Sequence, residues 1–232
     1  MSTIERERKY YLEKVLHTDQ GGQLDIDRMR FNHVFALFGF TGSGKDTVID
    51  GVLEKEKEIP LTRFVRTLTR ERRPAETDGV DDFFVERELF EYLKARDRFF
   101  HCYGKYGDEF GYDTDHFLFE LAQKNIIMVG GHENNMSGLR DGMKSLFPQI
   151  PLVCVFVNRP KEEILKSLGE RGETLEEVLK RREFIEKEWY EEPLQPVDAV
   201  IWNTDKDASV EQMRTLIEHY VTRHVDGKSC GR

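Results

Sequence analysis

Short apolar runs alternate with amphipathic segments along most of this chain. We interpret the apolar runs as strands over residues 33–39, 63–69, 125–131, 151–157 and 198–202. Between them, apolar positions recur at helical spacing, which predicts helices over residues 46–57, 87–95, 115–124, 161–170, 175–189 and 209–224. This alternation is typical of an α/β fold in which helices cover both faces of a parallel sheet, giving three layers. The last three runs are almost wholly apolar, as strands buried on both faces should be.

Some parts of the chain depart from this alternation. The N-terminal segment is polar and helix-prone, and the stretch between the second and third strands is rich in aromatic residues and glycine. The latter composition indicates a small antiparallel lobe inserted into the α/β core. The boundaries that we predict are an N-terminal extension at 1–32, a domain at 33–224 with its core at 33–62 and 125–224, a lobe at about 63–113, and a C-terminal tail at 225–232.

Composition narrows the class of protein. The 232 residues fit one domain with an inserted lobe, and the 35 Lys and Arg residues are scattered among 44 Asp and Glu residues. A net charge of −9 argues against a non-specific nucleic-acid binder. The apolar runs are far shorter than the roughly 20 residues of a membrane span. Cys102, Cys154 and Cys230 show neither a disulfide framework nor metal-ligand spacing, and the N-terminal residues lack the apolar core of a signal peptide. We therefore expect a soluble, cytoplasmic protein.

The strongest motif is GFTGSGKDT at residues 39–47, which follows an apolar strand and precedes an amphipathic helix. It matches the phosphate-loop (P-loop) pattern G-x-x-x-x-G-K. Glycines with positive φ let backbone N–H groups and the helix N-terminus converge on phosphates, while Lys45 reaches the β and γ oxygens of a nucleoside triphosphate. The motif predicts ATP contacts from Gly39, Thr41, Gly42, Ser43, Gly44, Lys45, Asp46 and Thr47.

Asp46 departs from the usual motif, in which a Ser or Thr hydroxyl at this position contacts Mg²⁺. An aspartate can hold Mg²⁺ directly or through water, because the ion prefers a carboxylate and retained waters. Alternatively, Asp46 only complements the positive end of the helix. Both interpretations remain open.

The segments after the loop resemble the guanylate kinase family, and the resemblance runs from about residue 33 to 222. LTRERRPAETDGVDDFFV at 68–85 resembles the family's acceptor-lobe signature, whose two arginines correspond to Arg70 and Arg73. When the family's pattern is continued along the chain from this signature without a gap, its later aromatic-glycine turn aligns with residues 107–111. The resemblance implies a P-loop kinase with a core sheet, a nucleoside-monophosphate lobe and a helical lid.

The lid and the end of the domain are also similar to that family. LGERGETLEEVLKRRE at 168–183 resembles the lid, which we place at about 168–190. Arg171 and Arg182 match its two arginines, and their spacing of 11 can place both on one helix face. With Lys45 they are the expected catalytic residues, neutralising charge on the transferring phosphoryl group. Asn203 matches an asparagine that lies near the donor base in the family.

The resemblance breaks down at the acceptor base. In guanylate kinases a serine and a glutamate read the guanine edge, and Arg66 and His101 stand at these positions. A cation and an imidazole cannot replace a carboxylate that accepts from guanine. Asp82 and Phe110 replace two phosphate-binding tyrosines, Tyr112 replaces a serine, and Gly130-Gly131-His132 replaces the family's D-I-D. The expected acceptor contacts are Arg66, Arg70, Arg73, Asp82, His101, Phe110, Tyr112 and His132.

These observations predict an ATP-dependent, Mg²⁺-dependent phosphotransferase. Its partner would be a small phosphorylated acceptor, a nucleoside or deoxynucleoside monophosphate, with guanine specificity in doubt. Three alternatives stay open: a kinase resembling ribose bisphosphate kinase, which shares the GKD loop; an ordinary guanylate kinase; and a non-catalytic guanylate-kinase-like binding module. The intact glycines and Lys45 favour an enzyme over the module. No nucleic-acid or membrane partner is expected, and the oligomeric state, a homodimer included, is open.

Overall fold

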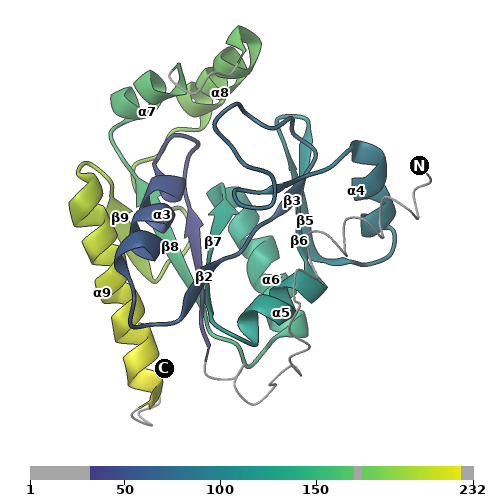
Figure 1. The fold of residues 1–232 in the computed structure, drawn as a ribbon. Helices are drawn as coiled ribbons and strands as arrows, with labels where there is room; N and C mark the ends of the chain where they lie inside the picture. Colours follow the sequence, from purple (N-terminus) through teal and green to yellow (C-terminus); the bar gives the residue numbers. More distant parts are fainter. Residues whose placement is uncertain (1–31, 170–173, 226–232) are drawn as a thin grey trace.

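The computed structural model of the chain describes residues 32–169 and 174–225 (Figure 1). The expected N-terminal extension and C-terminal tail, apart from one residue each, therefore lie outside the described residues. Of the helices that the structure describes, none combines the length and the apolar character that crossing a bilayer requires.

A parallel sheet of five strands forms the centre of the molecule. In spatial order it contains β2 (Leu61–Arg63), β7 (Asn125–Gly131), β1 (Val34–Phe38), β8 (Leu152–Asn158) and β9 (Ala199–Trp202). Each neighbouring pair is parallel, as the near-continuous apolar runs predict. The three-layer α/β prediction is confirmed.

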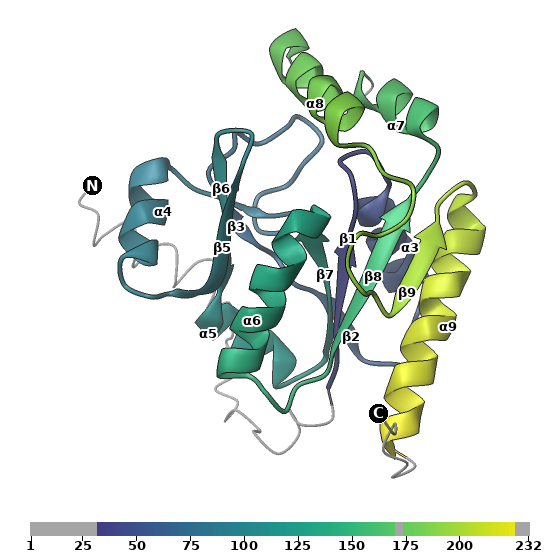
Figure 2. The same cartoon turned by 180° about the vertical axis from the view of Figure 1, so that it is seen from behind.

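Helices cover both faces of this sheet (Figure 2). Alternate residues of β1 divide between two hydrophobic clusters, because successive side chains of a strand point to opposite faces. Phe35 and Leu37 pack with α3 (Lys45–Lys55) and α9 (Lys206–Val225). On the other face, residues such as Phe38 pack with α5 (Thr114–Leu121) and α6 (Met136–Leu146).

The inserted lobe has a second sheet of four strands. In spatial order it contains β4 (Phe83–Phe84), β3 (Thr67–Leu68), β6 (Asp108–Asp113) and β5 (Phe99–Lys105). The pairs β3–β6 and β5–β6 are antiparallel, as expected for the inserted lobe, whereas the short pair β3–β4 is parallel. Leu89 and Leu93 of α4 (Arg87–Lys94) pack against this lobe through a small apolar cluster.

The apolar run at 63–69 does not form one strand, contrary to our prediction. Its beginning completes β2 in the central sheet, and Thr67 and Leu68 form β3 in the lobe. Between them, Phe64 packs in the core and Val65 in the lobe cluster. The chain crosses here from one hydrophobic core to another, and an unbroken apolar run does not reveal such a crossing.

Helix α6 was not predicted from the sequence. It follows a single 3₁₀ turn, Glu133–Asn135, and contains Gly138 and Gly142. A Cβ at Gly138 would lie 2.5 Å from His101 Cε1, and one at Gly142 would lie 2.7 Å from the backbone oxygen of Phe100. These glycines weaken the helical signal of the sequence, yet they let α6 lie close against β5.

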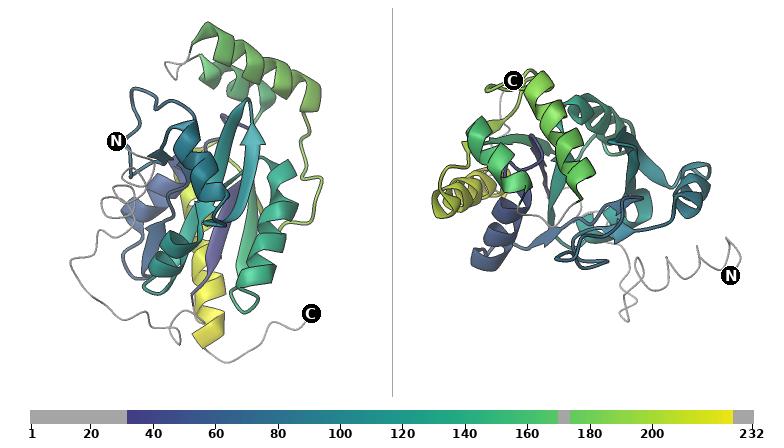
Figure 3. Two further views of the ribbon diagram at one scale, coloured as in Figure 1. Left: turned by 90° about the vertical axis from the view of Figure 1, so that its right-hand side faces the viewer. Right: turned by 90° about the horizontal axis from the view of Figure 1, so that it is seen from above.

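The segment expected as the lid, about 168–190, contains α8 (Leu175–Glu188), and α7 (Lys161–Leu168) precedes it; we use lid below for these two helices together. Seen from above, both lie over the core next to the lobe (Figure 3). A capping box starts α8, in which the Thr174 hydroxyl accepts from the Glu177 N–H and the Glu177 carboxylate accepts from the Thr174 N–H. Ile164 and Ile185 anchor the two helices on Phe40 at the start of the P-loop.

Candidate active site

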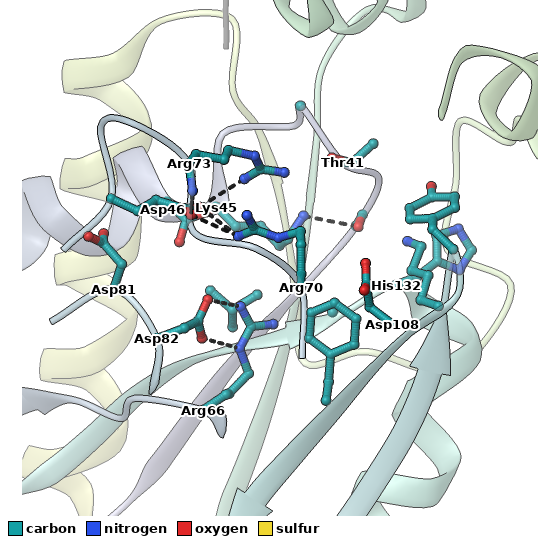
Figure 4. Close-up of a pocket in the computed structure, with 18 of the residues that line it drawn as sticks. Thr41, Lys45, Asp46, Arg66, Arg70, Arg73, Asp81, Asp82, Asp108 and His132 are labelled. Atoms are coloured by element: carbon teal, nitrogen blue, oxygen red, sulfur yellow. Dashed lines mark hydrogen bonds and ion pairs between the residues drawn. The ribbon is translucent and has the colours of Figure 1, made fainter. Parts of the chain in front are cut away.

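A cavity of about 470 Å³ lies where the P-loop, the lobe and the lid meet (Figure 4). Its lining comes from segments far apart in the sequence, including Thr41 of the P-loop, Asp82 of the lobe, His132 after β7 and Arg181 of α8. This position, beyond the carboxyl end of β1, is the usual one for ligands of open α/β sheets.

The P-loop has the expected backbone. Gly39, Gly42 and Gly44 have φ values of 142°, 88° and 89°. A side chain at Gly39 would be excluded, since its Cβ would lie 2.1 Å from the backbone oxygen of Val157. Lys45 Nζ donates to the carbonyl oxygens of Gly39 and Phe40 at 3.0 and 2.8 Å. The lysine thus lies across the inner side of its own loop.

Three other residues that we expected in the ATP site, Ser43, Thr47 and Asn203, do not line this cavity. Ser43 is buried, with its Oγ 3.4 Å from Lys45 Nζ, and Thr47 is exposed on the first turn of α3. Asn203, expected near the donor base, donates its side-chain amide to the backbone oxygen of Ser43 at 2.9 Å. In this structure Asn203 supports the P-loop from behind.

Asp46 faces the cavity and forms an ion pair with Arg63, with 2.6 Å between carboxylate and guanidinium. Arg63 also reaches Asp50 one turn later, at 2.8 Å. Although burial opposes it, the positive charges of Arg63, Arg66 and Lys45 lower the pKa of Asp46 to about 2. Among the described residues, no three His, Cys, Asp or Glu side chains gather to hold a metal by themselves. An ionised carboxylate at the cavity nevertheless fits Mg²⁺, which binds through one or two carboxylates together with substrate phosphates.

The two signature arginines of the lobe converge on one carboxylate. Arg70 Nη2 lies 2.7 and 2.9 Å from the two oxygens of Glu76, and Arg73 Nη1 lies 3.0 Å from one of them. The Arg73 backbone N–H donates to the other oxygen at 2.9 Å. All three residues line the cavity, whereas Arg72 is exposed and bonds the backbone oxygen of Glu76. Glu76 thus orients two guanidinium groups toward one place.

Arg66 and Asp82 form a buried bidentate ion pair. Arg66 Nε and Nη2 each lie 2.9 Å from one Asp82 oxygen, and the guanidinium carbon lies 5.5 Å from the ring centre of Phe110. Although burial alone would lower it, the carboxylate of Asp82 raises the pKa of Arg66 well above its usual value. All three line the cavity, so the guanidinium at the family's serine position is charged and already has a partner.

Two histidines mark a second cavity of about 510 Å³ that adjoins the first. His101 Nε2 contacts Asn135 Oδ1 at 2.5 Å, and burial lowers the pKa of His101. His132 lines both cavities, and burial together with the charges of Lys105 and Lys45 lowers its pKa to about 3. Both imidazoles are therefore neutral near pH 7.

Tyr112 lines neither cavity, and its expected role as a direct acceptor contact is corrected. It is fully buried in the core, where its hydroxyl donates to the backbone oxygen of Val129 at 3.1 Å. The side-chain amide of Asn135 donates to the same hydroxyl at 3.4 Å. Tyr112 and Phe110 lie on the same face of β6, but Tyr112 lies deeper, in the core cluster with residues of β7 and α6.

The lid presents a different arginine from the expected one. Arg182 is exposed and pairs with Glu186 on its own helix at 2.9 Å. Arg181 is only 7% exposed, lines the cavity and lies over the ring of Tyr106 at 5.0 Å. One residue turns a helix by about 100°, so Arg182, which matches the motif, is exposed while its neighbour Arg181 lines the cavity. Arg171 lies outside the described residues.

Several cavity residues were missed by the sequence analysis. Arg63, Tyr103, Lys105, Tyr106 and Asp108 line the cavity beside the expected residues. Of these five, Asp108 falls within the aromatic-glycine turn at 107–111, and the other four belong to none of the motifs. The signal that could have indicated Lys105 and Tyr106 is their place before Gly107, at the tip of the β5–β6 hairpin that reaches toward the lid.

Comparisons with known proteins agree with this geometry. The guanylate kinase family model matches residues 32–220. Guanylate kinase of Caldanaerobacter subterraneus subsp. tengcongensis is 30% identical over 188 residues, which are 79% of this chain and 85% of that protein. Guanylate kinase of Symbiobacterium thermophilum is 32% identical over 187 residues, 79% of this chain and 83% of that protein. A crystal structure of guanylate kinase from Anaplasma phagocytophilum is similar in fold, with a TM-score of 0.55 and 20% identity over 81% of this chain and 85% of that one. The chain therefore belongs to the guanylate kinase family and is a P-loop phosphotransferase.

Proposed function

We propose that the chain transfers the γ-phosphoryl group of ATP to a nucleoside or deoxynucleoside monophosphate, and that GMP is a poor acceptor. The observation that carries this proposal is one cavity lined by the P-loop on one side and by Arg70 and Arg73 on the other. A triphosphate on the loop and an acceptor phosphate on the arginines would meet within it. Such positioning supplies much of the catalysis of phosphoryl transfer.

The charged residues of the cavity support the transfer step. Lys45 and Arg181 are fixed cations that line the cavity, and charge develops on the transferring oxygens. Asp46, ionised at neutral pH, would hold Mg²⁺ together with phosphate oxygens, and the ion would neutralise charge on the triphosphate. Arg70 and Arg73, preoriented by Glu76, can clamp an acceptor phosphate through paired N–H donors.

The acceptor side disfavours guanine. Recognition of guanine by its N–H donors needs an acceptor such as a carboxylate. His101 is neutral and bonded to Asn135, and Arg66 is held by Asp82. Among the described residues that line the second cavity, none carries a carboxylate. Unpaired guanine donors would cost about 1 kcal/mol or more each, roughly tenfold in efficiency.

GMP is the natural rival acceptor, because the curated relatives are named guanylate kinases. A coupled assay of ADP release, with Mg²⁺ and ATP, compares nucleoside monophosphates, deoxynucleoside monophosphates and sugar phosphates directly. We expect a monophosphate other than GMP to be used at least about tenfold more efficiently than GMP. Turnover of GMP near 10⁶ M⁻¹s⁻¹, typical of a good enzyme, would refute the altered specificity. A sugar phosphate as the best substrate would reassign the acceptor.

The same assay tests whether the chain is a kinase at all. We expect Lys45→Ala to abolish turnover, because a fixed cation at the transferring oxygens is lost. Lys55→Ala is the matched control, since Lys55 ends the same helix, is exposed and pairs with the surface residue Asp207. Full activity of Lys45→Ala, or no turnover of any acceptor by the unmodified chain, would contradict the proposal.

A further inference from the structure

Lys105 is a lysine of the cavity for which neither motif nor resemblance provides a role. It ends β5 in the acceptor lobe and lines both cavities. Its ammonium nitrogen lies 4.8 Å from the ring centre of Tyr106 and 5.2 Å from that of Phe184. Because Phe184 belongs to α8, the ammonium group lies where the tip of the lobe meets the lid.

The neighbouring cations have partners that Lys105 lacks. Arg63 pairs with two aspartates, Arg66 with Asp82, and Arg70 with Glu76. Within residues 32–169 and 174–225, Lys105 forms no ion pair and no hydrogen bond through its ammonium group. Burial and the charges of Lys45, Arg181 and Arg66 lower its pKa well below the usual value. A buried cation among cations is unfavourable unless an anion joins it.

We propose that Lys105 contacts the phosphoryl group in transit, as a third cation beside Lys45 and Arg181. The inference rests on the proposed function and adds a residue to it.

In the transfer step, an oxygen of the acceptor phosphate attacks the γ-phosphorus and forms the new P–O bond. The bond from this phosphorus to the β–γ bridging oxygen breaks, and ADP leaves with that electron pair. Near pH 7 the attacking oxygen is largely deprotonated, since the second pKa of a phosphate monoester is about 6. Lys105 makes and breaks no covalent bond; its charge offsets the charge that develops.

The alternative is that Lys105 has a structural role and stabilises the contact between lobe and lid by packing between Tyr106 and Phe184. Lys105→Met distinguishes the two roles, because methionine keeps an unbranched apolar chain against both rings and removes the charge. Lys105→Arg keeps the charge. Lys94→Met is the control, since Lys94 belongs to the same lobe, is exposed and lies 3.7 Å from Glu109.

The first measurement needs no acceptor. Calorimetry in the presence of Mg²⁺ measures the affinity of the chain for ADP and for the β,γ-imido analogue of ATP. Of these two ligands, only the analogue carries a γ-phosphoryl group. We expect Lys105→Met to weaken binding of the analogue by about tenfold and to leave ADP binding unchanged, because only the analogue reaches the ammonium site. Equal affinities of Lys105→Met and the unmodified chain for the analogue would overturn the inference.

The second measurement uses the best acceptor of the ADP-release assay. Lys105→Met should lower kcat by about tenfold or more, Lys105→Arg should recover most of it, and Lys94→Met should match the unmodified chain. A normal kcat in Lys105→Met, or equal losses in Lys105→Met and Lys105→Arg, would assign Lys105 to packing. Failure of every acceptor with the unmodified chain would instead count against the proposed function, and the calorimetry would still decide the role of Lys105.

The pH profile gives a third readout. Among the described residues, the charged or titratable groups around Lys105 are Lys45, Arg66, Tyr106, His132 and Arg181, together with Asp108, its cross-strand partner in the β5–β6 hairpin. A lowered pKa means that Lys105 loses its charge at a lower pH than an ordinary lysine, so kcat/KM should fall as the pH rises through that value. Lys105→Arg should lack this decline, since a guanidinium stays charged. An identical decline in both proteins would contradict the inference and assign the titration to another group.

Discussion

Arg181 and Arg182 are neighbours in the sequence but belong to opposite environments. Arg181 is 7% exposed and faces the cavity, whereas the side chain of Arg182 is 58% exposed and pairs with Glu186. Exposed pairs one helical turn apart contribute only about 0.3–0.5 kcal/mol. We therefore assign the proposed role in phosphoryl transfer to Arg181, which lines the cavity.

The two arginines form a matched pair for mutagenesis. We expect Arg181→Met to lower kcat/KM by about tenfold or more, because a fixed cation near the transferring oxygens is lost. Arg182→Met should leave kcat/KM within about twofold of the unmodified chain, since an exposed pair contributes little. Steady-state kinetics with the best acceptor measures both. Equal effects at the two positions would refute this assignment of the lid arginine.

Asp82 lines the cavity and also supports the fold, because Arg66 is buried with it. Their side chains are 7% and 10% exposed. We expect Asp82→Asn to lower the free energy of unfolding by about 3–5 kcal/mol, since it leaves a buried guanidinium without its counter-charge. Urea titration measures the loss.

Replacing both partners of this pair is the control. The double variant Arg66→Met, Asp82→Leu should recover most of the lost stability, because an apolar pair of similar volume needs no counter-charge. A double variant as unstable as Asp82→Asn would show that packing around Asp82, and not the uncompensated charge, causes the loss.

At the scale of helices and strands, the sequence predicted an element correctly where the residues of that element show the hydrophobic pattern of a strand or helix. The capping box at Thr174 starts α8 within the predicted range, and β7, β8 and β9 match their apolar runs. Two elements were mispredicted because tertiary contacts define them. The run at 63–69 divides between two sheets, and α6 contains glycines that only its close approach to β5 explains.

The glycines of α6 allow a test of that close approach. We expect Gly142→Ala to destabilise the chain by about 1–3 kcal/mol, because its Cβ would lie 2.7 Å from the backbone oxygen of Phe100 and force β5 and α6 apart. This cost outweighs the gain of about 1 kcal/mol in helix propensity. Ser145→Ala on the exposed side of the same helix is the control and should be neutral or slightly stabilising. Stabilisation by Gly142→Ala in urea unfolding would show that the two elements can separate freely.

At the scale of the whole molecule, the site depends on three parts that meet only in the fold. The P-loop was predictable because its chemistry is contiguous in the sequence. Lys105 from the lobe and Arg181 from the lid approach the loop through tertiary packing, which no spacing encodes. The net charge of the chain, −9, does not indicate the local charge of the cavity. The cavity lining includes seven Lys and Arg residues and five Asp and Glu residues, so it is locally positive. Anionic substrates therefore meet a locally favourable field.

One ligand should be able to engage the P-loop and the lobe together. We expect an analogue that joins adenosine and the acceptor nucleoside through a chain of phosphates to bind on the order of 100-fold more tightly than ADP, because the second contact becomes intramolecular. Calorimetry measures both affinities.

Neighbouring arginines provide the control for this analogue. Arg73→Lys should remove most of the gain and leave ADP binding intact, because lysine lacks the paired donors of the guanidinium. Arg72→Lys should keep the gain, since Arg72 is exposed and bonds a backbone oxygen of the lobe. An analogue that binds no better than ADP would argue against a shared cavity for both substrates.

The bond from Asn203 to the backbone of Ser43 has a consequence for biosynthesis. These residues are 160 positions apart, and Asn203 follows the last strand of the central sheet. At 5–20 residues per second, a ribosome reaches Asn203 about 8 to 32 s after Ser43. Throughout that interval the nascent P-loop lacks the amide that supports it from behind. We therefore expect nascent chains arrested before β9 to retain no ATP in a pull-down, although the entire P-loop motif has already been synthesised.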